Sequence, residues 1–470
     1  MNGADDLDFE DEVDVAPNDR TLTDKGNAET FRELNDGRAC WCATKPGSGW
    51  MVWDRYRWRS DMERTSTAWA MEVGGWWRKK APPAPPAGSE DPLDKEQADR
   101  RKAILKHAAR SESAGAVRAM LDLAQPMMAI PGERFDADDM LLCTPSYYYN
   151  MSDWKRSAPR PEKYATRATA VDAGGDCPQW LAFLDKIMGG DQEIVTYLQK
   201  ALGYCLTGSN AENCIFIAYG SGANGKSTFM DTVMHVFGEY ALATRVETFM
   251  AQQQGSIPNA IAALDGARLV SCSETPEGGG LDEALVKQVS GGDMISARFL
   301  NREYFNFKPK FKLWMLTNHK PVIKGTDNGI WRRIRLIPFE VTIPPEQRDT
   351  GLTEKLKAEA GGILRWALAG LRLWREQGLK SPERIEAATE GYRSEMDILG
   401  EFLRDECEIG AQMFTSNTTL YSRYVEWAKA NGLVPKSHKW LSRALLDKQY
   451  TQDNGRAGRC WRGLTVRDRM

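Results

Sequence analysis

The nonamer GSGANGKST occupies residues 220–228 of this 470-residue chain. It fits the pattern G-x-x-x-x-G-K-[ST], in which glycines let backbone N–H groups turn toward phosphate oxygens. In this pattern the lysine reaches the β and γ phosphates, and the hydroxyl that follows it holds Mg²⁺. We therefore predict a nucleotide site formed by the whole loop: Gly220, Ser221, Gly222, Ala223, Asn224, Gly225, Lys226, Ser227 and Thr228.

The sequence on both sides of the loop supports nucleotide binding. IFIAY at 215–219 reads as a buried strand that runs into the loop. After the loop, apolar residues recur at positions 230, 233, 234 and 237, which is the spacing of an amphipathic helix that ends before Gly238. The positive end of this helix would face the phosphates. The context favours a phosphate loop over the alternative, a purely structural glycine loop.

Three further strands are predicted, and each carries a candidate for hydrolysis. ARLVSCSETPEG at 267–278 places Glu274 at a strand end, where a carboxylate can activate water or hold the metal. FKLWMLTN at 311–318 ends in Asn318, whose amide can orient the attacking water. IWRRIRLIPF at 330–339 begins with Arg332 and Arg333, whose charge can stabilise a transferring phosphoryl group. A solvated Glu, a turn Asn and a surface Arg pair are the alternatives, which the order of the three segments disfavours.

Between Glu274 and Asn318, residues 285–311 read as a helix broken by glycines and then a hairpin. Aromatic residues alternate there with lysines and arginines. This composition suits a nucleic-acid strand, because the cations can pair with its phosphates and the aromatic rings can stack on its bases. A structural hairpin with solvated charges is an equally supported alternative. The candidate DNA contacts are Arg298, Arg302, Lys308 and Lys310.

Charge distribution adds to this picture. The formal net charge is -3, but the segment 1–19 holds eight acids and no Lys or Arg, which leaves five excess positive charges elsewhere. We expect this tail to be disordered and to act in solubility, or alternatively as a DNA mimic. No apolar run is long enough for a membrane span, so we expect a cytoplasmic protein with reduced cysteines, and CWC at 40–42 lacks the partners of a zinc site.

Taken together, the motifs GSGANGKST, CSETPEG, KQVSGGDMISAR, FKLWMLTNHKP and GTDNGIWRRIRLIPF make residues 140–470 resemble the superfamily 3 helicase module of phage and plasmid primase-helicases. The resemblance implies an AAA+-type ATPase ring, usually hexameric, that moves 3′ to 5′ on single-stranded DNA and unwinds forked DNA. It implies that Lys226 and Ser227 hold ATP and Mg²⁺, that Glu274 is the second-motif acid and metal partner, and that Asn318 is the sensor.

The resemblance also implies roles for several basic residues. Arg332 or Arg333 would reach into the ATP site of the neighbouring subunit, and Arg302 would sit near the tip of a DNA-gripping hairpin. The C-terminal region resembles a winged-helix domain, with KSHKWLSRALL at 436–446 as the recognition helix. Its candidate DNA contacts are Lys439, Arg456 and Arg459. A protein-contact domain without DNA affinity is the alternative.

One departure from the family pattern leaves a metal ligand open. Many relatives place two adjacent acids at the second motif, whereas Glu274 is flanked by Ser273 and Thr275. Asp265 and Glu277 are the candidates for the missing carboxylate. A primase needs carboxylates fixed on a sheet, and the only dense acidic cluster lies in the tail, so we expect no primer synthesis by this chain.

The predicted architecture is an α/β fold whose AAA+-type ATPase core follows a helical domain. In the small N-terminal domain, Trp50, Trp53 and Trp58 are predicted to pack in a core rather than stack on bases. An ATP-controlled replication initiator, or a remodelling or packaging ring, is the alternative function, and a separate primase, polymerase or loader is a candidate partner. The predicted segments are an acidic tail (1–19), a Trp-rich domain (20–80), a Pro-rich linker (81–95), a helical domain (96–210), the ATPase core (211–345), a helical extension (346–392) and a winged helix (393–470).

Overall fold

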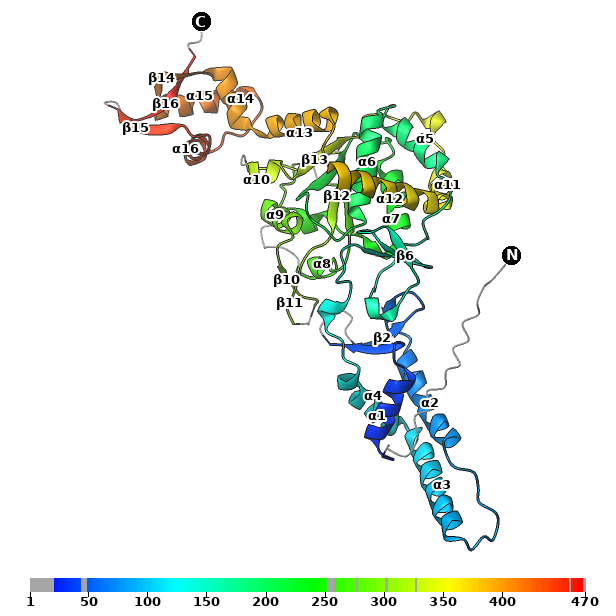
Figure 1. Cartoon of the computed structure of the whole chain (residues 1–470). Helices are drawn as coiled ribbons and strands as arrows, with labels where there is room; N and C mark the ends of the chain where they lie inside the picture. Colours follow the sequence, from blue (N-terminus) through cyan, green and yellow to red (C-terminus); the bar gives the residue numbers. More distant parts are fainter. Residues whose placement is uncertain are drawn as a thin grey trace. The chain divides into compact units, whose positions relative to one another are not determined.

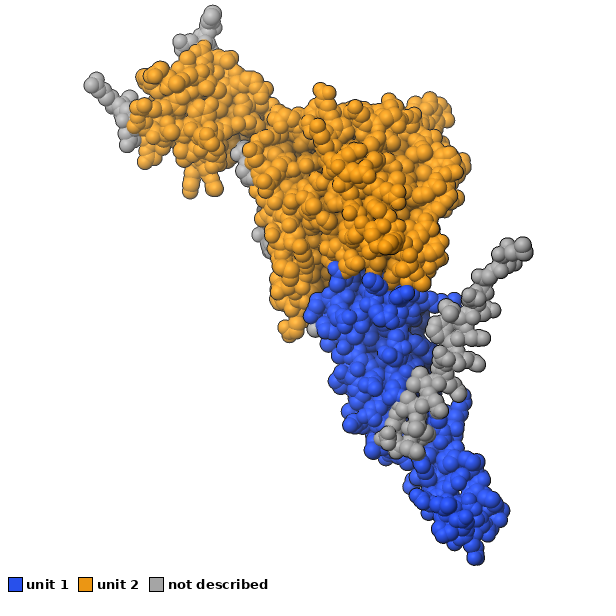
Figure 2. Space-filling model, viewed as in Figure 1, with its two compact units in different colours: residues 1–137, 159–166 blue, residues 138–158, 167–470 orange. Residues whose placement is uncertain are grey.

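The computed structural model describes residues 21–43, 49–251, 258–275, 278–300, 303–325, 328–455 and 458–467. The chain forms two compact units, residues 1–137 with 159–166 and residues 138–158 with 167–470 (Figure 2). The acidic tail predicted at 1–19 lies outside the described residues. Among the residues that the structure describes, none of the helices has the length and apolar character of a membrane span.

In the described part of the first unit, four α-helices contribute to an apolar core, and a three-stranded antiparallel sheet carries a second, smaller cluster that includes Trp58. The core includes Phe31, Trp77 and Met120. Trp58 is buried, and the Trp50 ring lies 5.4 Å from that of Phe31, so these aromatics pack as predicted. The elements are α1 (Asp24–Leu34), β1 (Ala39–Cys42), β2 (Gly49–Trp53), β3 (Trp58–Ser60), α2 (Thr65–Lys79), α3 (Pro92–Ser111) and α4 (Ala114–Met127).

The proline-rich segment does not separate two domains, contrary to the predicted linker at 81–95. It connects α2 to α3, and both helices contribute to the same core, for example through Trp77 and Ile104. The predicted helical domain at 96–210 is likewise divided, because α3 and α4 belong to the first unit and the helices after residue 177 belong to the second. Helical periodicity shows that a face is apolar, but it does not show which core covers that face.

The second unit is built on a five-stranded sheet of order β13-β7-β12-β9-β8, in which every neighbouring pair is parallel. The strands are covered on both faces, which explains their nearly continuous apolar sequences. Four of the five were predicted; β8 is too short to show a pattern. The strands are β7 (Ile215–Tyr219), β8 (Ala241–Ala243), β9 (Leu269–Ser273), β12 (Lys312–Thr317) and β13 (Ile334–Pro338).

Helices cover this sheet, and α6 packs along α12 (Figure 1). The two helices approach closely because glycines lie at their crossing: a Cβ at Gly203 would overlap the backbone of Leu371, and one at Gly370 would overlap that of Gln199. The helices of this region are α5 (Pro178–Ile187), α6 (Gln192–Cys205), α7 (Lys226–Phe237), α8 (Pro258–Ala262), α9 (Glu283–Gly291), α10 (Asn328–Trp331), α11 (Leu352–Ala358), α12 (Ala360–Gln377) and α13 (Glu383–Met396).

Two small antiparallel sheets accompany the central one. β10 (Ile295–Ala297) pairs with β11 (Phe305–Phe307), which confirms the predicted hairpin between α9 and β12. β4 (Leu141–Cys143), β5 (Tyr148–Asn150) and β6 (Lys155–Ser157) form a three-stranded sheet that was not predicted.

The C-terminal region has its own core around Phe402, Trp427 and Trp461. The segment predicted as a recognition helix is helical, as α16, and β14 and β15 both pair with β16 in a three-stranded sheet. The elements are α14 (Ile398–Glu406), β14 (Cys407–Ser416), α15 (Asn417–Ala430), α16 (His438–Asp447), β15 (Thr451–Gly455) and β16 (Gly458–Val466).

Candidate nucleotide-binding site

The loop between β7 and α7 has the backbone shape of an anion cradle. Gly222, Ala223 and Gly225 have φ values of +105°, +51° and +83°. A Cβ at Gly225 would lie 2.7 Å from Cγ2 of Ile187, so this position needs glycine both for its conformation and for space. Left-handed residues in such a turn direct N–H groups into a concave nest, and the amino end of α7 adds partial positive charge there.

Lys226 is the first residue of α7, and its side chain folds back into the loop. Its Nζ donates hydrogen bonds to the carbonyl oxygen of Gly220 (2.7 Å), to Oδ1 of Asn224 (3.0 Å) and to Oδ1 of Asn318 (3.1 Å). All three acceptors are neutral, and the lysine is only 7 % exposed. Burial without a counter-charge lowers the pKa of Lys226 to about 8. An anionic phosphate would supply the missing charge.

The strand order brings the predicted hydrolytic residues to the same edge of the sheet as the loop. Asn318 follows the last residue of β12, the strand beside β7, and its bond to Lys226 joins residues 92 positions apart. Glu274 follows β9, the next strand, and its N–H donates to the carbonyl of Leu316 on β12 (3.0 Å). The Glu274 side chain is exposed, and its φ of +66° is uncommon for a residue with a side chain.

The Thr275 hydroxyl fixes the turn after Glu274. It lies in hydrogen-bonding contact with the Thr317 hydroxyl and donates to the carbonyl of His319 (2.6 Å). These bonds tie the ends of β9 and β12 together, and so hold Glu274 and Asn318 in register. Sequence reasoning gave Thr275 no role, because its partners lie 42 and 44 positions further along the chain.

A pocket of about 500 Å³ opens beside the loop, between α7, the β8–β9 edge and α11. Ser227 lines it together with Asp231, Ser271, Ser273 and Lys357, among others. Ser227 and Asp231 are four residues apart and therefore share a face of α7. Sequence reasoning missed Asp231, and this spacing was the available signal.

The residues present fit a magnesium nucleotide. Mg²⁺ is commonly held by one or two protein oxygens together with substrate phosphates and water. In the described ranges no three His, Cys, Asp or Glu side chains form a metal cluster. Ser227 and Glu274 are the residues that would hold the metal together with the phosphates. The structure removes Asp265 as a further ligand, because it precedes β9 and so lies at the opposite edge of the sheet. Glu277 lies outside the described residues.

The two predicted arginines have different environments. The Arg333 guanidinium is half-buried and donates to Oγ of Ser290 (3.1 Å) and to the carbonyl of Gly329, which holds it against its own subunit. The Arg332 side chain is exposed and makes no hydrogen bond or ion pair with another described residue. Of the pair, Arg332 is therefore the one available to a neighbouring molecule.

The hairpin presents only some of its predicted cations. Arg298 and Lys308 are exposed, and the Arg298 guanidinium lies 4.8 Å from the centre of the Tyr304 ring. Nζ of Lys310 instead pairs with Oδ1 of Asp139 (2.6 Å), so its charge is already engaged within the unit. Arg302, at the predicted tip, lies outside the described residues.

In the C-terminal region, α16 carries the predicted Lys439 on its exposed side. Arg443, four residues later, is exposed on the same face and was missed, although the i, i+4 spacing indicates it. Arg459 is exposed on β16, and Arg456 lies outside the described residues. The region thus presents a basic helix face and a basic strand.

The fold and the site define the class: a mixed α/β protein whose parallel central sheet carries a glycine-rich loop between β7 and α7. Comparison with known proteins narrows this. Residues 28–189 match the family described as D5 N terminal like, and residues 218–333 match a family of unknown function. The protein named "Putative helicase L207/L206" of Acanthamoeba polyphaga mimivirus is 31% identical over 270 residues, which are 53% of this chain and 28% of that protein.

The protein named "Putative helicase 184R" of Invertebrate iridescent virus 6 is 23% identical over 352 residues, 66% of this chain and 36% of that protein. The chain thus spans about a third or less of the length of these relatives. Among solved structures, the apo structure of the NrS-1 C-terminal region covers 63% of this chain and 77% of its own length, at 15% identity and a TM-score of 0.43. Over these parts of its length the chain is therefore similar to viral proteins of the D5 and putative-helicase type.

Proposed function

We propose that the chain is the ATP-driven part of a replicative DNA helicase, which works as a ring, moves 3′ to 5′ on single-stranded DNA and separates forked duplex. The observation that carries this proposal is the hydrogen bond between Lys226 and Asn318. It joins the phosphate loop directly to the end of β12, at the edge where Glu274 also lies. A nucleotide bound at the loop and the attacking water would therefore lie close together at this end of the sheet.

The side chains divide the work of hydrolysis among them. Bound ATP with Mg²⁺ supplies the phosphoryl group, and the metal neutralises part of its charge. The loop N–H groups and Lys226 would hold the phosphates, and the Ser227 hydroxyl would be a ligand of the metal. The Glu274 carboxylate accepts a proton from the attacking water, while the Asn318 amide, released from Lys226, orients that water.

Ring assembly follows from the position of Arg332 in this proposal. A guanidinium that stabilises the transferring phosphoryl group contributes strongly to turnover, and Arg332 has no partner of its own among the described residues. If Arg332 completes the site of the neighbouring subunit, each site is incomplete in a monomer. The β10–β11 hairpin, with Arg298 and Lys308 exposed, would then carry single-stranded DNA as the subunit interfaces open and close.

The basic face of α16 favours a second candidate function, an ATP-controlled initiator that binds duplex DNA without unwinding it. Lys439 and Arg443 lie on one exposed helix face, as expected of a helix that enters the major groove. In that case single-stranded DNA would leave ATP turnover unchanged.

The test is strand displacement from a forked duplex with ATP and Mg²⁺, measured together with ATP turnover. We expect Lys226→Ala to lower both by at least about a hundredfold, because the phosphates lose their only lysine in the loop. Lys186→Ala, which removes an exposed lysine on α5, is the matched control and should act like the native protein. Turnover without DNA stimulation and without strand release would refute the helicase proposal.

A further inference from the structure

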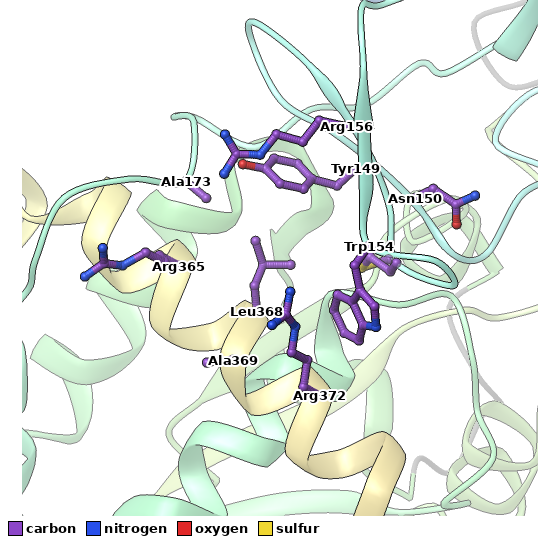
Figure 3. Close-up of a pocket in the computed structure, with 10 residues that line it drawn as sticks. Tyr149, Asn150, Trp154, Arg156, Ala173, Arg365, Leu368, Ala369 and Arg372 are labelled. Atoms are coloured by element: carbon purple, nitrogen blue, oxygen red, sulfur yellow. The ribbon is translucent and has the colours of Figure 1, made fainter.

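A second pocket, away from the phosphate loop, lies between the small β4–β5–β6 sheet and α12 (Figure 3). It has a volume of about 230 Å³. From the sheet side it is lined by Tyr149 on β5, Trp154 in the β5–β6 turn and Arg156 on β6, and from α12 by residues three and four positions apart on one helix face. The α12 residues are Arg365, Leu368, Ala369 and Arg372.

The charge in this pocket is of one sign, since three of its ten lining residues are arginines and none is acidic. Two acids lie nearby. Asp176 pairs with the pocket residue Arg365, and Asp172, which interacts electrostatically with Arg156, accepts hydrogen bonds from the Ser146 hydroxyl (2.6 Å) and N–H (3.0 Å). Arg156 and Arg372 keep exposed guanidinium groups at the mouth. Such planar, permanently charged groups bind phosphate with paired hydrogen bonds.

Hydrogen bonds hold the turn that carries Trp154, the aromatic side of the pocket. Trp154 has a φ of +63°, and the Arg375 guanidinium fixes this turn by donating to the carbonyls of Met151 (2.7 Å) and Ser152 (2.8 Å). The Arg372 guanidinium lies 4.7 Å from the centre of the Trp154 ring. Arg375 is therefore structural, whereas Arg372 reaches the pocket with no ion pair to a described residue.

The Tyr149 hydroxyl points to a ligand independently of the arginines. Tyr149 is only 7 % exposed, the Arg156 guanidinium lies 4.9 Å from the centre of its ring, and no described residue accepts its hydroxyl proton. Burial raises the pKa of Tyr149, and the nearby Arg156 partly offsets this effect. A buried hydroxyl beside a guanidinium is a ready donor to an anion, and Figure 3 shows the two groups next to each other.

We propose that this pocket binds the phosphate of a nucleotide unit through Arg156, Arg372 and the Tyr149 hydroxyl, with the adjoining sugar or base against Trp154. Its volume is below the roughly 300–1,000 Å³ of pockets that enclose whole small ligands, which suits one backbone phosphate of a single strand better than a free triphosphate. The site does not use the phosphate loop. It extends the proposed function, on which it rests, by giving DNA a contact that does not depend on ATP.

The test is fluorescence anisotropy of a labelled oligo(dT) with the full chain and no ATP. Arg156→Gln and Arg372→Gln should each weaken binding about tenfold, as expected for a lost hydrogen bond to a charged group. Lys155→Gln is the matched control, because Lys155 precedes Arg156 on β6 and its side chain leaves the opposite face of the strand. It should bind within about twofold of the native protein.

Tyr149→Phe separates a ligand role from a structural one. Because no described residue accepts the hydroxyl proton, the thermal unfolding temperature should change little, whereas oligo(dT) binding should weaken severalfold. A second experiment measures binding of a fluorescent ATP analogue to the Lys226→Ala variant, with and without Arg372→Gln. If adding Arg372→Gln abolishes this binding, the pocket binds a free nucleotide, and the proposal of a strand phosphate is overturned.

Each result has a defined reading. Arginine and tyrosine variants that bind both probes like Lys155→Gln would overturn the proposal, as would a Tyr149→Phe variant that is destabilised but binds normally. Failure of ATP turnover in the native protein would refute the proposed function alone, since this assay contains no ATP.

Discussion

Raising the pH above 8 is expected to weaken nucleotide binding through Lys226. Its ammonium donates only to the neutral oxygens of Gly220, Asn224 and Asn318, and burial lowers its pKa to about 8. Nucleotide phosphates are negative charges at short range, so they favour the charged form and raise this pKa again. Binding must therefore be accompanied by proton uptake wherever the free protein has already lost the proton.

The magnitude follows from the fraction of free protein that carries the proton. With a pKa of about 8, roughly nine-tenths of Lys226 is charged at pH 7 and roughly one-tenth at pH 9. If the bound lysine stays charged throughout, the affinity falls about tenfold between these values, or about 1.4 kcal/mol. The phosphates are already ionised in this range, since their last pKa is near 6, so they add little.

The assay is isothermal titration of a non-hydrolysable ATP analogue with Mg²⁺ between pH 7 and 9.5. Repeating it in buffers of different ionisation enthalpy counts the protons, and close to one proton should be taken up per nucleotide at pH 9. Lys226→Arg is the control, because a guanidinium keeps its charge at every pH used and its affinity profile should be flat. A flat profile for the native protein, or the same slope for Lys226→Arg, would refute the reasoning.

Four further changes probe the site and its support. Asn318→Ala should lower ATP turnover about a hundredfold with little loss of nucleotide affinity, and an equal loss of both would contradict its role in orienting water. Arg332→Ala should lower ATP turnover about a thousandfold without changing the unfolding temperature. Mixing the Arg332→Ala and Lys226→Ala proteins should restore part of the turnover, because a site shared between subunits can combine an intact lysine with an intact arginine. Arg333→Ala should lower the free energy of unfolding by about 1–3 kcal/mol, measured in denaturant, because it removes hydrogen bonds to the Ser290 hydroxyl and the Gly329 carbonyl. Gly203→Ala should cost about 1–3 kcal/mol by the same measurement, because its Cβ overlaps α12, whereas Gly391→Ala on α13 meets no atom within 4 Å and should cost nothing.

The sequence was most informative where structure depends on local pattern. Apolar runs that end in polar residues predicted four strands of the central sheet, and the glycine-rich loop lies between a strand and a helix as predicted. The hairpin before β12 was also predicted. The carboxyl ends of parallel strands lie at the same end of a sheet. The placement of Glu274 and Asn318 at strand ends therefore also indicated that they lie near the loop.

Tertiary structure decided which of the candidate groups are free to act. Arg332 and Arg333 are neighbours in the sequence, but only Arg333 donates a hydrogen bond to Ser290. Lys308 and Lys310 are equivalent candidates in the sequence, but only Lys310 forms an ion pair with Asp139, which lies in a distant part of the chain. The same holds for Lys226, whose neutral acceptor Asn318 comes from another strand, and for the arginine pocket, whose two walls are far apart in the sequence. The sequence by itself determined the elements and the chemistry each could carry, because periodicity and turn residues act over a few positions. Charge, burial and free partners were settled only by long-range packing, since the energy of an ionisable group depends on what the fold places around it.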